Sequence, residues 1–179
     1  MAREVSVSVS AHGYGAEEAF DHRAEMTKNI VIKTKNGQEF LEMLTSLSKN
    51  QGTIRMLKIF SHSYPRGIIM TNWSGFYDEP GPHDTKQAAY IKDMATRVEN
   101  GEIVFSPNCE IRIFGCNIGG SFSQLLSMAT HCTVIGSTGG TYPEIRGNRE
   151  TGVFISTSEW AVYKNGNYTY SAGKRLKAW

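Results

Sequence analysis

Apolar residues recur along the chain with two spacings, which predict strands that alternate with helices. Val5, Val7 and Val9 alternate with serines, a pattern typical of a half-buried edge strand. Further strands are predicted at residues 29–34, 54–60, 111–114 and 133–136. Because helical segments separate most of these runs, the pattern indicates a parallel sheet with helices on both faces.

Helical spacing marks the segments between the predicted strands. Phe40, Leu41, Leu44 and Leu47 share one face of a predicted helix. Helices are predicted over residues 38–49, 86–99 and 121–130, with a shorter one over residues 16–22. Loops rich in turn residues are predicted over residues 73–85 and 138–143.

The C-terminal region has the pattern of a β-hairpin. Residues 152–156 and 160–170 are expected to form antiparallel strands, and Asn165-Gly166 is a favoured hairpin turn within the second. No composition break or repeat divides the chain. We therefore predict one α/β domain over residues 1–179, with a mostly parallel central sheet and an appended C-terminal β-hairpin.

Length, composition and charge narrow the class of protein. The 179 residues are 40% hydrophobic, enough for one domain with a sizeable core. A formal net charge of +2, with both signs interspersed, gives no electrostatic footprint for nucleic acid, and no apolar run is long enough to span a membrane. Residues 1–10 have a strand pattern rather than that of a signal peptide, so we expect a cytoplasmic protein or one exported by a non-Sec route.

The chain has three cysteines, Cys109, Cys116 and Cys132. An odd and sparse count argues against a disulfide framework and is typical of a reducing compartment. Without a C-x-x-C pair a cysteine-based zinc site is not expected, and nothing in the sequence calls for a metal or a cofactor. Cys132 is expected in the core, and Cys109 at the far end of the strand that leads to Cys116.

Two apolar strands end abruptly on reactive side chains. Residues 57–63 end with Ser61-His62-Ser63, and residues 111–120 pass through Gly115-Cys116-Asn117. If these strands are parallel neighbours, His62 and Cys116 meet at the carboxyl edge of the sheet, where open α/β sheets place their sites. An adjacent imidazole and the start of the helix near residue 121 both favour the reactive thiolate. The pattern predicts a cysteine hydrolase.

Structural explanations compete with this one. A single cysteine after a strand is often a small buried hydrophobe, and a single histidine is often a solvated loop residue. His12 also follows a strand and is a rival base, although its strand is expected to be peripheral. A phosphatase-type Cys-x5-Arg loop is excluded because Phe122 occupies the arginine position. Three further histidines, His22, His83 and His131, lack ligand spacing and are expected at the surface.

The order of these motifs is similar to that of the caspase-like cysteine peptidases, which include caspases, gingipains, clostripain and legumain. Ser61-His62-Ser63 and Gly115-Cys116-Asn117 resemble the Ser-His-Gly and Gly-Cys-Asn strand endings of a bacterial caspase-like domain family found in large surface proteins. Residues 134–140 resemble the strand and turn that follow there. The resemblance covers about residues 29–140.

The resemblance implies a caspase-like three-layer sandwich with Cys116 as nucleophile and His62 as general acid/base. Backbone amides of Ser63 and Cys116 would hold the oxyanion. The family's glycine after the histidine is replaced by Ser63, whose Cβ restricts that turn.

The substrate pocket is not carried over by a motif. The segments expected to border it are residues 137–142, with Ser137, Thr138 and Gly139, and residues 73–84, with Asp78. Acidic residues of the second segment would favour a basic substrate side chain, and the competing interpretation is that they are solvated loop acids. The acidic residues of this segment are Asp78, Glu79 and Asp84.

The leading hypothesis is a cysteine peptidase that acts on a peptide or protein through a thioester at Cys116. One alternative is a non-catalytic caspase-like module that binds a partner, which the replacement at Ser63 motivates. Another is a bacterial effector or toxin that uses the same Cys116 and His62 pair. The sequence does not indicate the oligomeric state.

Overall fold

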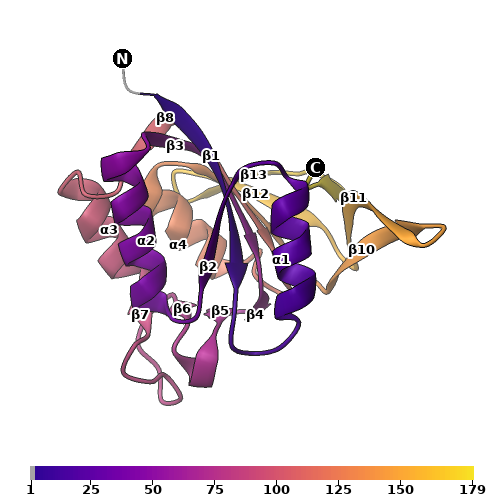
Figure 1. Cartoon of the computed structure of the whole chain (residues 1–179), viewed down its shortest axis with the longest axis horizontal. Helices are drawn as coiled ribbons and strands as arrows, with labels where there is room; N and C mark the ends of the chain where they lie inside the picture. The colour runs from indigo at the N-terminus through magenta and orange to yellow at the C-terminus, as the bar shows by residue number, and fades with distance from the viewer. Residues whose placement is uncertain (1–2) are drawn as a thin grey trace.

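The computed structural model describes residues 3–179, so Met1 and Ala2 of the expected N-terminal strand lie outside the described residues. A seven-stranded sheet with the order β13-β12-β9-β8-β3-β1-β2 forms the centre of this α/β protein (Figure 1). Its parallel strands are β1 (Glu4–Ala11), β2 (Ile30–Thr34), β3 (Thr53–Phe60), β8 (Phe105–Phe114) and β9 (Thr133–Ser137). The antiparallel strands β12 (Trp160–Lys164) and β13 (Asn167–Ser171) complete one edge.

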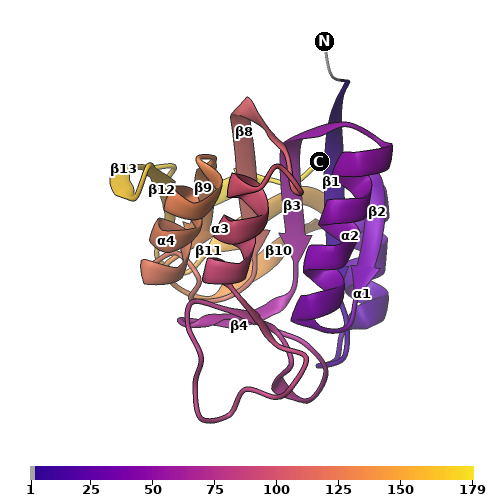
Figure 2. The same ribbon diagram turned by 90° about the vertical axis from the view of Figure 1, so that its left-hand side faces the viewer.

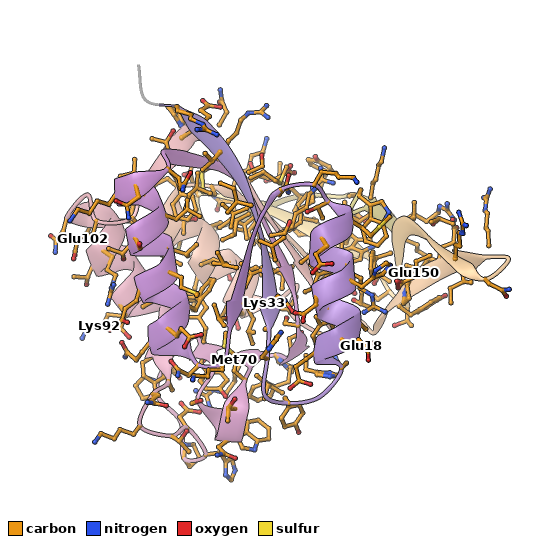
Figure 3. The ribbon with its side chains drawn as sticks, viewed as in Figure 1. Glu18, Lys33, Met70, Lys92, Glu102 and Glu150 are labelled. Atoms are coloured by element: carbon orange, nitrogen blue, oxygen red, sulfur yellow. A yellow bond between two sulfur atoms is a disulfide. The ribbon has the colours of Figure 1, made fainter. Side chains whose placement is uncertain are left out.

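Both faces of the central sheet are covered. Three helices lie side by side on one face (Figure 2), namely α2 (Gly37–Asn50), α3 (Ile91–Glu99) and α4 (Ser121–Thr130). The opposite face carries α1 (Glu17–Met26) and a small sheet of β10 (Thr141–Arg146), β11 (Arg149–Ser156) and β14 (Arg175–Lys177) (Figure 1). Arg23 of α1 pairs with Glu150 of β11 at 2.8 Å, and Figure 3 labels Glu150 on this side of the molecule.

A third sheet lies below the carboxyl ends of the central strands in Figure 1. It contains β4 (His62–Tyr64), β5 (Gly67–Ile69), β6 (Phe76–Tyr77) and β7 (Ala89–Tyr90), with the short 3-10 helix η1 (Thr71–Trp73) between β5 and β6. Met70, labelled in Figure 3, accepts a hydrogen bond from the Thr34 hydroxyl at 3.6 Å. This contact joins the third sheet to the end of β2.

Alternation along the central strands divides the core into two clusters. Leu57 and Ile59 of β3 pack toward α2, α3 and α4 together with Ile111 and Ile113 of β8. Phe60 points to the other face, where it is in the cluster that contains residues of α1, β11 and β14. Burying a side chain of this size stabilises the fold by about 1.5–3 kcal/mol.

The N-terminal strand is an inner strand, and the prediction of an edge strand is wrong. β1 lies between β2 and β3, and its residues Ser8 and Ser10 are fully buried. Their hydroxyls are satisfied by α1 and by the residue that follows it, because Ser10 donates to Asp21 at 2.7 Å and Ser8 bonds with Thr27 at 2.7 Å. The Val–Ser alternation thus separates an apolar face from a polar face that a helix covers.

Several expected boundaries change for local reasons. The helix predicted over residues 86–99 begins at Ile91 because β7 occupies the two preceding residues. The predicted loop at 73–85 contains the buried strand β6, and the loop at 138–143 contains the first residues of β10. The two-residue strands β6 and β7 lack enough residues to show an alternation in the sequence.

The C-terminal hairpin is part of the central sheet rather than an appendage. β12 pairs with β9, and the hairpin turn at Asn165 and Gly166 joins it to β13. β11 pairs instead with β10 and β14, so the expected pairing of residues 152–156 with residues 160–170 is wrong. Trp160 accounts for the position of β12 within the central sheet, because its fully buried ring packs in the second core cluster.

Cys109 and Cys132 form a disulfide, which contradicts the prediction from the cysteine count. Cys109 lies in β8 and Cys132 directly precedes β9, and these neighbouring parallel strands bring the two Cα atoms within 4.8 Å. The cysteine count therefore no longer indicates a reducing compartment. Within residues 3–179, the helices are too short or too polar to cross a membrane.

Replacing both residues of the disulfide, Cys109→Ser and Cys132→Ser, is expected to lower the free energy of unfolding by about 3 kcal/mol, since the bond closes a loop with a sequence separation of 23. Urea unfolding of the oxidised protein measures this. Thiol titration of unfolded, unreduced wild type should find only the Cys116 thiol. Titration of all three cysteines would contradict the disulfide.

Candidate active site

The register of β3 and β8 places His62 and Cys116 at the same edge of the central sheet. The two strands are parallel neighbours, and Phe60 opposite Phe114 is the last pair of their ladder. His62 and Cys116 each follow two residues later. The Ser63 hydroxyl donates to the carbonyl of Cys116 at 2.7 Å, so the two chains stay in contact beyond the ladder.

Both reactive side chains lie on the face that α1 and the β10–β11 sheet cover. The stacked rings of Phe60 and Phe114, 5.1 Å apart, mark this face. The ring of His62 contacts Phe20 of α1 at 5.1 Å, and the Cys116 sulfur contacts Thr141 of β10. The sheet does not separate the imidazole from the thiol.

Thr141 holds the thiol in place. Its backbone N–H donates to the Cys116 sulfur at 3.4 Å, and its hydroxyl donates to the Gly115 carbonyl at 2.8 Å. Cys116 is a free, half-buried cysteine. The thiol in turn lies 4.0 Å from the Thr141 carbonyl, so both backbone groups of Thr141 contact the sulfur.

The loop after β8 is tied to the loop after β9. The Asn117 amide donates to the Gly139 carbonyl and the Gly119 amide to the Ser137 carbonyl, each at 2.8 Å. Among residues 3–179, the N–H groups of Cys116, Ile118 and Gly120 have no acceptor. The amide of Cys116 is thus one of three in this loop that are available to an oxyanion.

Two glycines allow these loops to approach closely. A Cβ on Gly115 would lie 2.2 Å from the Ser63 hydroxyl, and a Cβ on Gly119 would lie 2.3 Å from the Gly136 carbonyl. Any larger residue would push the loops apart. Gly115 and Gly119 thus serve the close packing of these loops.

Aromatic rings orient the imidazole of His62. Phe20 and Tyr14 meet it edge to face, with ring centroids 5.1 and 5.6 Å away. Within the described part of the chain, no hydrogen bond joins the imidazole to the Cys116 sulfur. Packing, rather than a carboxylate partner, sets the orientation of this ring.

The residues expected to border a substrate pocket divide into two groups. Ser137, Thr138 and Gly139 join β9 to β10 and adjoin the Cys116 loop. Asp78 lies below the sheet and pairs with Arg66 at 3.2 Å. Arg66 also pairs with Asp84 at 3.4 Å, so one guanidinium is shared by two carboxylates, and Glu79 is exposed. Because one positive charge faces three acids, this segment retains net negative charge.

His12, the rival base, is bound to a carboxylate. It follows β1, and its ring nitrogen bonds with Asp21 at 2.6 Å. Burial alone would raise the pKa of Asp21, but the hydrogen bonds from Ser10 and His12 outweigh it and hold that pKa below its ordinary value. The other three histidines are exposed as predicted, and no group of ligands suited to a metal occurs among residues 3–179. The three exposed histidines are His22, His83 and His131.

Sequence reasoning assigned no role to two residues that contact His62, and it included Thr141 only within residues 137–142, the segment expected to border a pocket. Thr141 touches Cys116, and Tyr14 and Phe20 touch His62. Each is distant in sequence from the residue it contacts, so no local spacing identifies it. The Gly13-Tyr14-Gly15 triplet is a local signal of a turn, because glycine adopts positive φ angles readily.

Ser63→Ala removes the hydroxyl that donates to the Cys116 carbonyl. We expect the free energy of unfolding to fall by about 1 kcal/mol, the usual net value of one hydrogen bond. Urea unfolding measures it, with Ser121→Ala as the control at an exposed serine near the site. Equal stability of wild type and Ser63→Ala would show that this bond does not hold the two loops together.

Asp21→Asn tests the carboxylate beside His12. Because the folded-state pKa of Asp21 is lowered, its contribution is present above its ordinary pKa of 3.8 and is lost as pH falls through the lower, folded-state value. The variant should be less stable than wild type at about pH 7, and the difference should shrink below about pH 3. Thermal unfolding measures this, with exposed Glu25→Gln of α1 as control. A difference independent of pH would contradict the pairing.

The chain matches no protein-family model, no curated protein and no solved structure. The function is therefore inferred from the geometry of these two residues and from the two short motifs that carry them.

Proposed function

We propose that the protein is a cysteine peptidase of caspase-like type, with Cys116 as nucleophile and His62 as general acid/base. One observation carries the proposal: neighbouring parallel strands deliver a thiol and an imidazole to the same edge and the same face of the sheet. Buried thiols that serve only packing need no imidazole nearby and no backbone donor directed at sulfur.

The reaction is acyl transfer. His62 takes the thiol proton, and the Cys116 sulfur attacks the carbonyl carbon of a peptide bond. The N–H of Cys116, with the amide of Ser63, holds the negative oxygen of the tetrahedral intermediate. As the C–N bond breaks, His62 gives its proton to the leaving amine. Water then attacks the thioester, the C–S bond breaks, and the thiol is restored.

A substrate strand has a place to bind beside the thiol. Thr141, which contacts Cys116, begins β10, and β10 is an edge strand of its three-stranded sheet. Its side chains Tyr142 and Ile145 are 48% and 62% exposed. An extended peptide that pairs with such an edge is held by main-chain hydrogen bonds, which leaves selectivity to its side chains.

A non-catalytic binding module is the second candidate. It is favoured by the aromatic packing of His62, which forms no hydrogen bond to sulfur within the described residues, and by the extensive bonding of the Cys116 loop. In that case the same edge and strand bind a partner without cleaving it. A biological activity that survives Cys116→Ala would support this candidate over the peptidase.

The Cys109–Cys132 disulfide bears on where the protein acts. Disulfides persist mainly in oxidising compartments. Of the two expected locations, the disulfide favours export over the cytoplasm.

Incubation with a mixed peptide library, read by mass spectrometry, tests the peptidase. Wild type should produce cleavages that Cys116→Ala does not, and His62→Gln should slow them by about 100-fold or more. Circular dichroism verifies that each variant is folded, and exposed His22→Gln is the matched control. Equal loss in His12→Gln and His62→Gln, or cleavage that survives Cys116→Ala, would contradict the assigned roles.

A further inference from the structure

A surface cavity at the amino edge of the central sheet has the Cys109–Cys132 disulfide in its wall. Its volume is about 410 Å³, and it lies where the amino ends of β8 and β9 meet the end of β12. The two cysteines are 3% and 1% exposed, so they form the floor of the cavity rather than its rim. The exposed residues of the lining are Pro107, Asn108, His131, Lys164 and Asn165.

Lys164 brings a positive charge close to the disulfide. Tyr163 opposite Val134 is the last pair of the ladder between β12 and β9. The next residue of β12, Lys164, therefore lies beside the start of β9, which directly follows Cys132. Within residues 3–179, Lys164 forms no salt bridge, so its charge is available to a molecule in the cavity.

His131 is the second basic residue of the lining. It follows α4 in a left-handed conformation, with a φ angle of 61°, and directly precedes Cys132. Among the described residues that line the cavity, none is Asp or Glu. Glu110, which adjoins Cys109, pairs with Arg112 at 3.2 Å. The charges of the lining therefore favour a negatively charged molecule.

The same charges favour opening of the disulfide. Thiol–disulfide exchange is faster when the departing sulfur is stabilised as a thiolate, and neighbouring basic groups provide that stabilisation. Cys132, with His131 beside it and Lys164 near the next residue, is the cysteine from which such a thiolate would form. A disulfide that only closes a loop needs neither a cavity at the bond nor a basic lining.

We propose that this cavity is a thiol–disulfide exchange site for a small thiol that carries a carboxylate or a sulfonate. The thiolate of this molecule attacks the Cys109 sulfur, the S–S bond breaks, and Cys132 departs as a thiolate that takes up a proton from water. A second thiolate attacks the small molecule's own sulfur in the mixed disulfide and releases Cys109. The protein disulfide is thereby reduced, and two small thiols are oxidised to one disulfide.

Exchange makes the stability of one segment depend on the thiols around the protein. The ring that the bond closes contains the second half of β8, the Cys116 loop and α4. Opening the ring returns conformational freedom to the unfolded chain, which destabilises the folded state. This inference does not rest on the proposed peptidase function.

Three thiols of similar size and different charge test the site, namely mercaptoethanesulfonate, mercaptoethanol and cysteamine, which are negative, neutral and positive. New thiols in the folded, oxidised protein are trapped with iodoacetamide and assigned to Cys109 and Cys132 in a digest. Each rate is divided by the rate for the same protein unfolded in urea, which removes the intrinsic reactivity of the reagent. The normalised rate for the negative thiol should exceed that for the positive thiol about tenfold, the effect of unit charges a few ångströms apart.

Variants at exposed positions locate the origin of this preference. Lys164→Gln should reduce it at least threefold, and Lys164→Gln combined with His131→Gln should abolish it, because the lining then carries no basic residue. Arg146→Gln is the matched control, since it removes one positive charge from the distant hairpin of β10 and β11. Circular dichroism verifies that each variant is folded.

Two outcomes would overturn the proposal. Equal normalised rates for the three thiols would show that the bond opens only when the chain unfolds. A preference that the double variant retains would show that the cavity does not select the reagent. Both results leave the peptidase function standing, because peptide cleavage is not measured in this assay.

Discussion

The parallel pairing of β3 with β8 is the constraint on which the candidate site depends. Side chains on a strand alternate between faces, so a shift of one residue in this register would send one of the two reactive groups to the opposite face. The stacked rings of Phe60 and Phe114 stabilise the register at its last pair. Beyond that pair, the bond from Ser63 to the Cys116 carbonyl continues the contact.

The segment that carries Cys116 is held at both ends of the sheet. At the amino edge the Cys109–Cys132 disulfide closes a ring that contains the second half of β8, the Cys116 loop and α4. At the carboxyl edge the loop is fixed by bonds to the residues between β9 and β10. Cys116 thus lies in a segment closed by a disulfide, whereas His62 is positioned by rings from α1 and the loop before it.

Much of the scaffold is predictable from the sequence, because long apolar runs and helical spacing are local signals. The helix over residues 121–130 and the strand endings before His62 and Cys116 follow from them. Contacts between distant segments are not predictable in this way. The position of β1 depends on α1 covering its serines, the disulfide depends on strand neighbours, and the donor from Thr141 depends on a short strand that has no visible pattern.

The proximity of residues 62 and 116 is the central claim, and a cross-link tests it most directly. A short bifunctional thiol reagent joins two cysteines only when their sulfur atoms lie within its span. In His62→Cys, such a reagent should join the new thiol to Cys116, so that a digest contains the two linked peptides. Peptides of residues 62 and 116 that each carry the reagent but remain unlinked, with Cys109–Cys132 intact, would contradict the account.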